Sequence, residues 1–205
     1  MENPKTDRTA RGRWKLLLVI AVCAAPLLAS YFMYYVVKPK GGVTNYGTLL
    51  DARQYPIPAM ASTLLDGHAA TLADYRGKWI MLKVGPSACL DACQDQLFAM
   101  RQLRTMQGKA MDRVERVWLI TDNAPLETML LRVNDGTHML RAPADVVQQW
   151  LPVQPGDTAA DYVYLIDPLG NLMMRFPKGA VSSDTARVGK VHKDLAKLLK
   201  ASAIG

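Results

Sequence analysis

Two of the three cysteines in this chain of 205 residues, Cys89 and Cys93, stand four positions apart. Side chains at positions i and i+4 of a helix share one face, so these two can close a disulfide after a modest adjustment of the helix's first turn. As thiolates they can instead hold one soft metal ion, such as Cu(I). The pattern therefore predicts thiol–disulfide chemistry or copper binding. A plain stabilising disulfide is the alternative that the spacing leaves open.

The residues around the pair predict the end of a buried strand and the start of a helix. The apolar run Trp79–Val84 is typical of a buried strand. After it, apolar residues recur every three or four positions from Leu90 to Leu103, as on the buried face of a helix. The N-terminus of a helix lowers the pKa of a nearby thiol, whereas Asp91, between the cysteines, acts in the opposite direction. The cysteine pair is thus expected at a strand-to-helix turn.

The rest of the sequence alternates predicted strands and helices. In chain order these are a strand end and turn at 64–68, a helical turn at 72–78, a strand at 114–121, a helix at 126–133, a short strand at 139–141, a helix opened by Pro143, a hairpin of 162–166 with 172–176, and a C-terminal helix with an apolar stripe from Val188 to Leu199. Strands alternating with helices favour a partly parallel sheet covered on both faces. The closing hairpin and helix fit a thioredoxin-like α/β domain, and no glycine-rich phosphate loop follows a strand.

An uncharged run of 22 residues, Leu16–Val37, precedes this domain. As a helix it would reach about 33 Å, enough to cross a hydrocarbon core of about 30 Å. A cleaved signal peptide is the alternative, but its apolar region is usually shorter, about 7–15 residues. The length of the run and the aromatic residues at its end favour one uncleaved transmembrane helix.

These observations divide the chain into a cytoplasmic tail (1–15), a transmembrane anchor (16–37), a glycine-containing linker (38–50) and a thioredoxin-like domain (51–205). Five Lys/Arg residues in the tail predict, by the positive-inside rule, that it faces the cytoplasm. In a bacterium this makes a single-pass inner-membrane protein whose periplasmic domain holds the cysteines in an oxidising compartment. The net charge of +7 includes no dense Lys/Arg run, so nucleic-acid binding is not expected.

The segment Met81–Cys93 resembles the metal-site segment of the Sco/SenC family, and segments 72–79 and 164–170 and the N-terminal anchor also look like that family. Its members are membrane-anchored, thioredoxin-like assembly factors for the copper centre of cytochrome c oxidase. The family's segment is a strand, a glycine, a short turn and Cys-Pro-Asp-x-Cys-Pro. The matching residues are Gly85, Cys89, Asp91 and Cys93, while Leu90 and Gln94 replace the two prolines.

The resemblance implies an accessory protein for cytochrome c oxidase assembly that acts by thiol–disulfide exchange, by transient Cu(I) binding, or by both. Its partner would be a respiratory oxidase subunit or another thiol-bearing protein. In thioredoxin-like domains the first cysteine is usually the attacking thiol, which assigns that role to Cys89 and the resolving role to Cys93. Both would be the ligands of Cu(I). The alternatives are a general periplasmic thiol–disulfide oxidoreductase and a non-catalytic scaffold with a structural disulfide.

The family's third copper ligand, a histidine, has no counterpart in this sequence, because the matching segment 156–161 contains none. His192 falls among the lysines of the C-terminal helix, His68 in an early turn and His138 after a loop glycine. None of them occupies the matching place. A Cu(II) site of two sulfurs and one nitrogen is therefore not expected, whereas Cu(I) binding and disulfide exchange need only the two cysteines.

Overall fold

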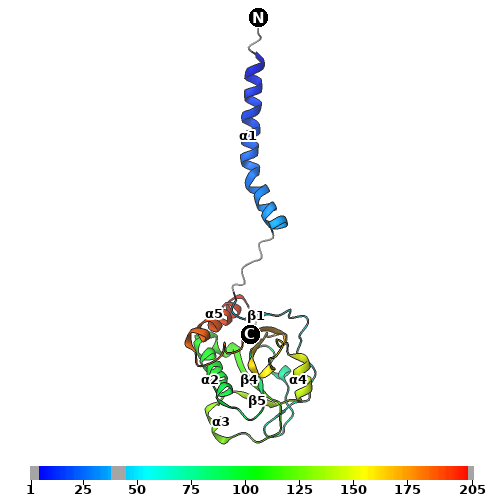
Figure 1. The fold of residues 1–205 in the computed structure, drawn as a ribbon, viewed down its shortest axis with the longest axis vertical. Helices are drawn as coiled ribbons and strands as arrows, with labels where there is room; N and C mark the ends of the chain where they lie inside the picture. Colours follow the sequence, from blue (N-terminus) through cyan, green and yellow to red (C-terminus); the bar gives the residue numbers. More distant parts are fainter. Residues whose placement is uncertain (1–4, 38–44, 203–205) are drawn as a thin grey trace. The chain divides into compact units, whose positions relative to one another are not determined.

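The computed structural model describes residues 5–37 and 45–202, with side chains from Arg13 onward in the first of these ranges. The chain divides into two compact units, Met1–Thr44 and Asn45–Gly205 (Figure 1).

The first unit is helical. Helix α1 runs over Lys5–Phe32 with Pro26 inside it, and the π-helical turn η1 follows over Met33–Val37. The stretch Arg13–Val37 is long and apolar enough to cross a membrane, and none of its side chains is buried. This stretch contains the predicted anchor, 16–37. Residues 1–4 of the predicted tail lie outside the described residues, and the side of the membrane that the tail faces stays a prediction.

The second unit is built on a mixed sheet which, within residues 45–202, has seven strands in the order β1-β7-β6-β3-β4-β5-β2. The strands are β1 (Thr48–Leu49), β2 (Thr63–Leu64), β3 (Trp79–Gly85), β4 (Val114–Ile120), β5 (His138–Arg141), β6 (Val163–Ile166) and β7 (Leu172–Phe176). Strands β3, β4 and β5 are parallel, while β6 and β7 form an antiparallel hairpin beside β3. The predicted partly parallel sheet is confirmed.

Helices cover both faces of this sheet. Helices α2 (Asp91–Met106) and α5 (Thr185–Ala201) lie side by side on one face, and α4 (Ala144–Trp150) packs on the other (Figure 1). The shorter helices are α3 (Thr128–Val133) and the 3-10 helices η2 (Leu72–Tyr75), η3 (Gly108–Arg113) and η4 (Ala159–Asp161). This is the thioredoxin-like α/β architecture that the sequence predicts.

Strand β3 lies at the centre of the sheet, and all seven of its residues are buried. Successive side chains of a strand point to opposite faces. Ile80, Leu82 and Val84 accordingly belong to the core beneath α4, and Trp79 and Met81 to the core beneath α2 and α5. Burial on both faces explains why the sequence of β3 is an almost continuous apolar run.

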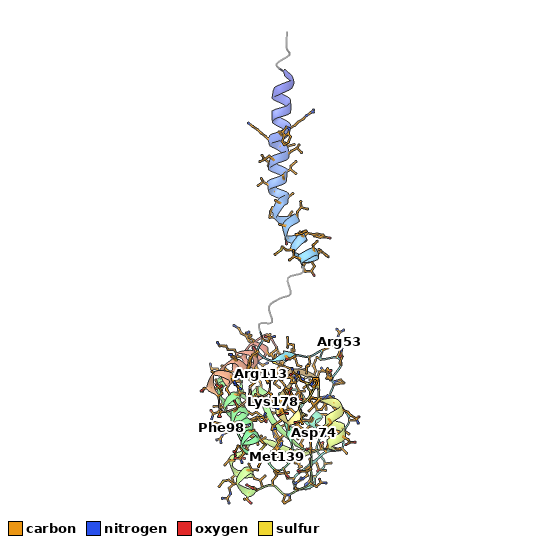
Figure 2. The ribbon with its side chains drawn as sticks, in the orientation of Figure 1. Arg53, Asp74, Phe98, Arg113, Met139 and Lys178 are labelled. Atoms are coloured by element: carbon orange, nitrogen blue, oxygen red, sulfur yellow. A yellow bond between two sulfur atoms is a disulfide. The ribbon has the colours of Figure 1, made fainter. Side chains whose placement is uncertain are left out.

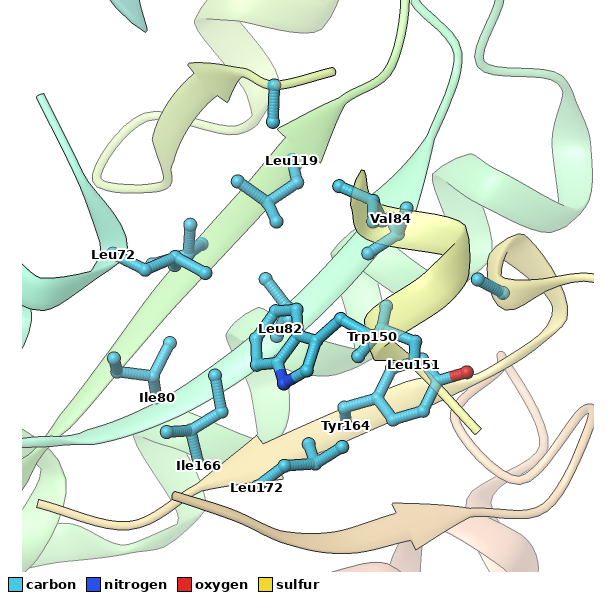
Figure 3. Close-up of a cluster of buried hydrophobic side chains, with 14 of the residues drawn as sticks. Leu72, Ile80, Leu82, Val84, Leu119, Trp150, Leu151, Tyr164, Ile166 and Leu172 are labelled. Atoms are coloured by element: carbon cyan, nitrogen blue, oxygen red, sulfur yellow. The ribbon is translucent and has the colours of Figure 1, made fainter. Parts of the chain in front are cut away.

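The core beneath α4 is closed by large side chains. Figure 3 shows Trp150 and Leu151 lying over Leu82 of β3 and Tyr164 of β6. Together with hydrogen bonds from the Tyr164 hydroxyl and the Arg175 side chain to the Pro152 carbonyl, this packing holds the segment after α4 against the sheet on its way to η4.

The folded unit begins earlier than the sequence predicted. Of the predicted linker, 38–50, residues 38–44 lie outside the described residues, but Thr48–Leu49 form β1 and pair with β7. The backbone N–H groups of Tyr46 and Gly47 donate to the buried Asp194 carboxylate at 2.6 and 2.9 Å. A strand of two residues is too short to show alternation, and the nearby glycines indicated a flexible segment instead. The linker boundary at residue 50 was therefore wrong.

Replacing Asp194 with alanine should loosen this first strand. We expect Asp194→Ala to lower the free energy of unfolding by about 2–4 kcal/mol, because two backbone N–H groups lose their acceptor. Urea denaturation of the full chain in detergent, followed by tryptophan fluorescence, measures it. Asp112, whose carboxylate is 77% exposed beside Arg104, provides the control Asp112→Ala, expected to cost below about 1 kcal/mol. A loss in Asp194→Ala no larger than the control would contradict this account of β1.

Candidate redox site at the start of helix α2

Cys89 and Cys93 form a disulfide, with their Cα atoms 5.2 Å apart. Helix α2 begins at Asp91 with Leu90 as its N-cap, so Cys89 precedes the helix and Cys93 lies in its first turn. The structure thus brings together the two residues that the sequence singled out, at a turn that follows β3 directly.

Hydrogen bonds hold the turn between β3 and α2. The Ser87 N–H points at the Asp122 carboxylate, 3.1 and 3.2 Å from its two oxygens. The Cys89 N–H donates to the Ser87 carbonyl at 2.8 Å, and the Gln94 side-chain amide donates to the Cys89 carbonyl at 3.0 Å. The backbone around Cys89 is therefore fixed by contacts that do not depend on the S–S bond.

The two cysteines differ in their surroundings. Cys89 is 6% exposed and belongs to a buried cluster that includes Trp118 and Ile120. Cys93 is half-buried and lines a cavity of about 440 Å³, whose wall does not include Cys89. The cavity lies between the turn before α2, helix η4 and the segment 178–182. Cys89 thus lies within the cluster, whereas Cys93 packs on the cluster and also borders the cavity.

A buried lysine also lines this cavity. Lys83 is 2% exposed, and its Nζ donates to the carbonyls of Val84 and Ala160, at 2.8 Å in each case. Burial lowers the pKa of Lys83 to about 8, against the opposing attraction of Asp161. An ammonium donates up to three hydrogen bonds, and the described part of the chain supplies acceptors for two of them. Lys83 is not among the predicted site residues, although a lysine within an apolar strand run is a visible signal in the sequence.

The segment 156–161, which stands where the family has its histidine, forms an ion-pair cluster instead. Lys178, labelled in Figure 2, places its Nζ 3.2 Å from Asp157 and 3.0 Å from Asp161. A hydrogen bond from the Tyr162 hydroxyl lowers the pKa of Asp157. These carboxylates have cationic and hydroxyl partners of their own, so the segment is stabilised without an imidazole.

His138 lies away from the cysteines. It opens β5, where its ring stacks on Tyr75 with centroids 4.4 Å apart and its Nε2 is 3.2 Å from the Glu115 carboxylate. Because β5 is parallel to β4 and β3, its first residue lies at the edge of the sheet opposite to the end of β3, where Cys89 and Cys93 stand. His138 is not brought to the cysteine pair.

The other two histidines are also held elsewhere. His192 Nδ1 is 3.0 Å from the side chain of Gln107, beyond the C-terminal end of α2, and His68 is exposed beside Asp66 in the turn after β2. Among the described residues, no three or more His, Cys, Asp or Glu side chains gather in a group that could hold a metal ion. The site offers copper two sulfur ligands and no imidazole.

Solved structures of Sco proteins have the same fold. A SCO1/SenC family lipoprotein from Bacillus anthracis is 17% identical with a TM-score of 0.53, over 75% of this chain and 98% of that one. Yeast Sco1 with copper bound is 14% identical with a TM-score of 0.55, over 73% and 95%. BsSco is 16% identical with a TM-score of 0.51, over 74% of this chain and 95% of that one. It is a member of the Sco family of cytochrome c oxidase assembly proteins in which a disulfide switch has been identified. At these identities the likeness shows the fold alone.

Family models describe both parts of the chain, whereas no curated protein matches it. A transmembrane-like N-terminal domain matches residues 6–37. A transmembrane-like, thioredoxin-like C-terminal domain matches residues 79–202, which contain the disulfide, the buried lysine and the ion-pair cluster. The chain therefore belongs to the family of transmembrane-like, thioredoxin-like C-terminal domains, and it has the fold of the Sco/SenC proteins that its sequence resembles.

Proposed function

We propose that this protein is a membrane-anchored thiol–disulfide exchange protein that uses the Cys89–Cys93 pair on a protein partner during the assembly of a respiratory oxidase. The observation that carries the proposal is the position of the disulfide, at the N-terminus of α2 with Cys93 beside an open cavity. A helix N-terminus stabilises a thiolate and so favours reversible exchange. The domain would face an oxidising compartment, the periplasm in a bacterium.

Exposed apolar side chains beside the disulfide support a polypeptide partner. Leu90, between the two cysteines, is 78% exposed, and Pro86 and Ala88 are exposed as well. Apolar side chains at a reactive site suit a docked chain, whose own apolar residues would cover them. A respiratory oxidase subunit is the first partner to test, because BsSco, which has this fold, is described as an oxidase assembly protein.

A neutral polar side chain at position 90 should separate docking from chemistry. We expect Leu90→Asn to slow the reduction of the disulfide by a protein dithiol, for which reduced thioredoxin serves as the probe, by about tenfold. Reduction by dithiothreitol should stay within about twofold, because a small thiol does not need the apolar surface and the variant adds no charge to the cavity wall. Leu169→Asn, at a 65% exposed leucine in the turn at the opposite edge of the sheet, is the matched control. Equal slowing with both reductants would argue against a docking surface.

Transfer of Cu(I) as cargo is the second candidate function. Reduced Cys89 and Cys93 would present two thiolates from adjoining positions, and thiolates are the ligands that Cu(I) prefers. The observation that favours this function is the fold shared with yeast Sco1, which was solved with copper bound. With no imidazole beside the sulfurs in the described residues, a Cu(II) site of two sulfurs and one nitrogen does not fit.

Competition for Cu(I) tests this second function. The reduced full chain in detergent is titrated against a chromophoric Cu(I) chelator, next to its Cys89→Ser variant. If Cu(I) is cargo, the chain binds one equivalent tightly and the variant loses at least about a hundredfold in affinity, because Cys93 is then the one thiolate left at the site. Equal affinities in the two proteins would remove copper and leave disulfide exchange.

A further inference from the structure

The disulfide is asymmetric toward an incoming thiol. Both cysteines pack in the cluster that includes Trp118 and Ile120, but of the two only Cys93 also forms part of the wall of the 440 Å³ cavity. Thiol–disulfide exchange requires the attacking thiolate to approach one sulfur along an open path. The half-buried Cys93 offers that path, and the 6% exposed Cys89 does not.

We propose that Cys93 is the sulfur that receives the partner, that Cys89 is the leaving thiol, and that the Lys83 ammonium draws the incoming anion into the cavity. These roles reverse those that the thioredoxin-like resemblance assigns from the order of the cysteines. The inference rests on the proposed exchange function and specifies which atoms carry it out.

A thiolate of the partner's dithiol attacks Cys93 Sγ, the new S–S bond forms as the Cys89–Cys93 bond breaks, and the electron pair leaves on Cys89 Sγ. The partner's second thiolate then attacks the partner sulfur of this mixed disulfide and releases Cys93 as a thiolate. Two electrons pass to the pair Cys89 and Cys93, and the partner dithiol becomes a disulfide. The protons given up by the partner's thiols are recovered from water when the two new thiolates are protonated.

The start of α2 favours Cys89 as the leaving group. The first N–H groups of a helix have no acceptor within it, and they carry the positive end of the helix dipole. Cys89 directly precedes the N-cap Leu90, while the N–H groups of Cys93 and Gln94 are already bonded to the Leu90 carbonyl. A thiol whose thiolate is stabilised departs faster. The apolar side chains around Cys89 alone would disfavour this charge, so Cys89 can leave because the free N–H groups at the start of α2 stabilise its thiolate.

The charges that face the cavity single out Lys83. Lys178 is paired with two carboxylates, Asp157 and Asp161, so this group carries a net negative charge, and the Asp95 carboxylate in the wall keeps its charge while it accepts a hydrogen bond from the Ser183 hydroxyl. Lys83 has two carbonyl partners and a third N–H for which the described residues supply no acceptor. A buried ammonium in a low-dielectric wall attracts an anion more strongly than an exposed one does. The approaching nucleophile is such an anion.

Trapping the mixed disulfide tests the assignment of the sulfurs. The oxidised full chain in detergent is exposed briefly to glutathione, quenched with acid and N-ethylmaleimide, and fragmented by mass spectrometry. We expect glutathione on Cys93 and the maleimide on Cys89.

The reactivity of each single thiol is an independent measurement. In a Cys23→Ala background, reduced Cys89→Ser keeps only the Cys93 thiol and reduced Cys93→Ser keeps only the Cys89 thiol. The Cys93 thiol should react with Ellman's reagent at least about tenfold faster than the Cys89 thiol. Adducts on Cys89, or the opposite order of rates, would overturn the assignment. No adduct on either cysteine, with glutathione or reduced thioredoxin, would instead refute the proposed function itself.

A charge-selectivity ratio tests Lys83. Reduction of the disulfide is timed with anionic 2-mercaptoethanesulfonate and with cationic cysteamine. In Lys83→Met we expect the ratio of the two rates to fall by about threefold or more, because the attraction for the anionic thiol is lost. A purely structural defect would change both rates together and leave the ratio unmoved. Lys109→Met, at an exposed lysine of η3, should keep the wild-type ratio. An unchanged ratio in Lys83→Met would overturn the role of this lysine.

Discussion

Replacing either Cys89 or Cys93 with serine should abolish disulfide exchange with a protein dithiol, a loss of at least about a thousandfold in rate. Neither variant can form the intramolecular disulfide that accepts the two electrons, so the reaction has no oxidant. The readout is the conversion of reduced thioredoxin to its disulfide by the oxidised full chain in detergent, with free thiols counted by maleimide mass shifts. Cys23→Ser, which changes the one free thiol, is the control and should retain the wild-type rate.

The same variants should remain folded. Closing a loop of this length with a disulfide contributes about 2 kcal/mol in the chain-entropy account, which is small beside the stability of a typical domain. Urea denaturation would thus show a modest shift for Cys89→Ser and Cys93→Ser. A variant that unfolds outright, or one that keeps more than a tenth of the exchange rate, would contradict the assignment of these cysteines as a reactive rather than a structural pair.

The second large effect is a dependence of stability on pH that comes from Lys83. Its pKa in the folded protein is about 8, below the ordinary value of 10.5, because burial disfavours the charged form. Between these two values the unfolded chain binds more protons than the folded one, so the free energy of unfolding contributed by Lys83 rises with pH. From pH 7.5 to pH 10 this contribution should increase by about 2 kcal/mol.

The comparison with Lys83→Met isolates the contribution of Lys83 to the pH dependence of the free energy of unfolding. Methionine fills similar space without a titrating group, so the variant lacks the contribution while other groups titrate equally in both proteins. Urea denaturation at pH 7.5 and pH 10, in a Cys23→Ala background that removes the free thiol, gives the change in the free energy of unfolding between the two pH values for each protein. We expect wild type to gain about 2 kcal/mol on the variant over this interval. Parallel pH profiles for the two proteins would show that Lys83 does not titrate with a lowered pKa.

The elements that position the site could be predicted from the sequence. The apolar run of Trp79–Val84 and the apolar spacing from Leu90 to Leu103 predicted β3 and α2, because a strand buried on both faces and an amphipathic helix each have a distinct pattern. The placement of Cys89 and Cys93 at the turn between them followed from these two elements. The edge strand β1 has two residues and shows no such pattern, whereas the end of β2 at Leu64 agrees with the strand end and turn predicted at 64–68.

The asymmetry of the site could not be predicted in the same way. Whether Cys89 or Cys93 faces the core depends on side chains from other strands, such as Trp118 of β4, which packs in the same cluster as Cys89. The partners of Asp161 include Lys178, which follows β7 and meets η4 only in the folded chain. Lys83 was visible in the sequence as a charge within an apolar run, but its position beside the same cavity as Cys93 is a tertiary property.

The measurement that tests the central claim most directly is the reduction potential of the Cys89–Cys93 disulfide. The full chain in detergent is equilibrated in graded dithiothreitol or glutathione redox buffers, quenched, and its free thiols are counted by maleimide mass shifts. An exchange protein should have a midpoint between about −300 and −120 mV, the range spanned by known dithiol oxidoreductases. A midpoint well below about −300 mV, where disulfides resist biological reductants, would identify a structural bond and contradict the account.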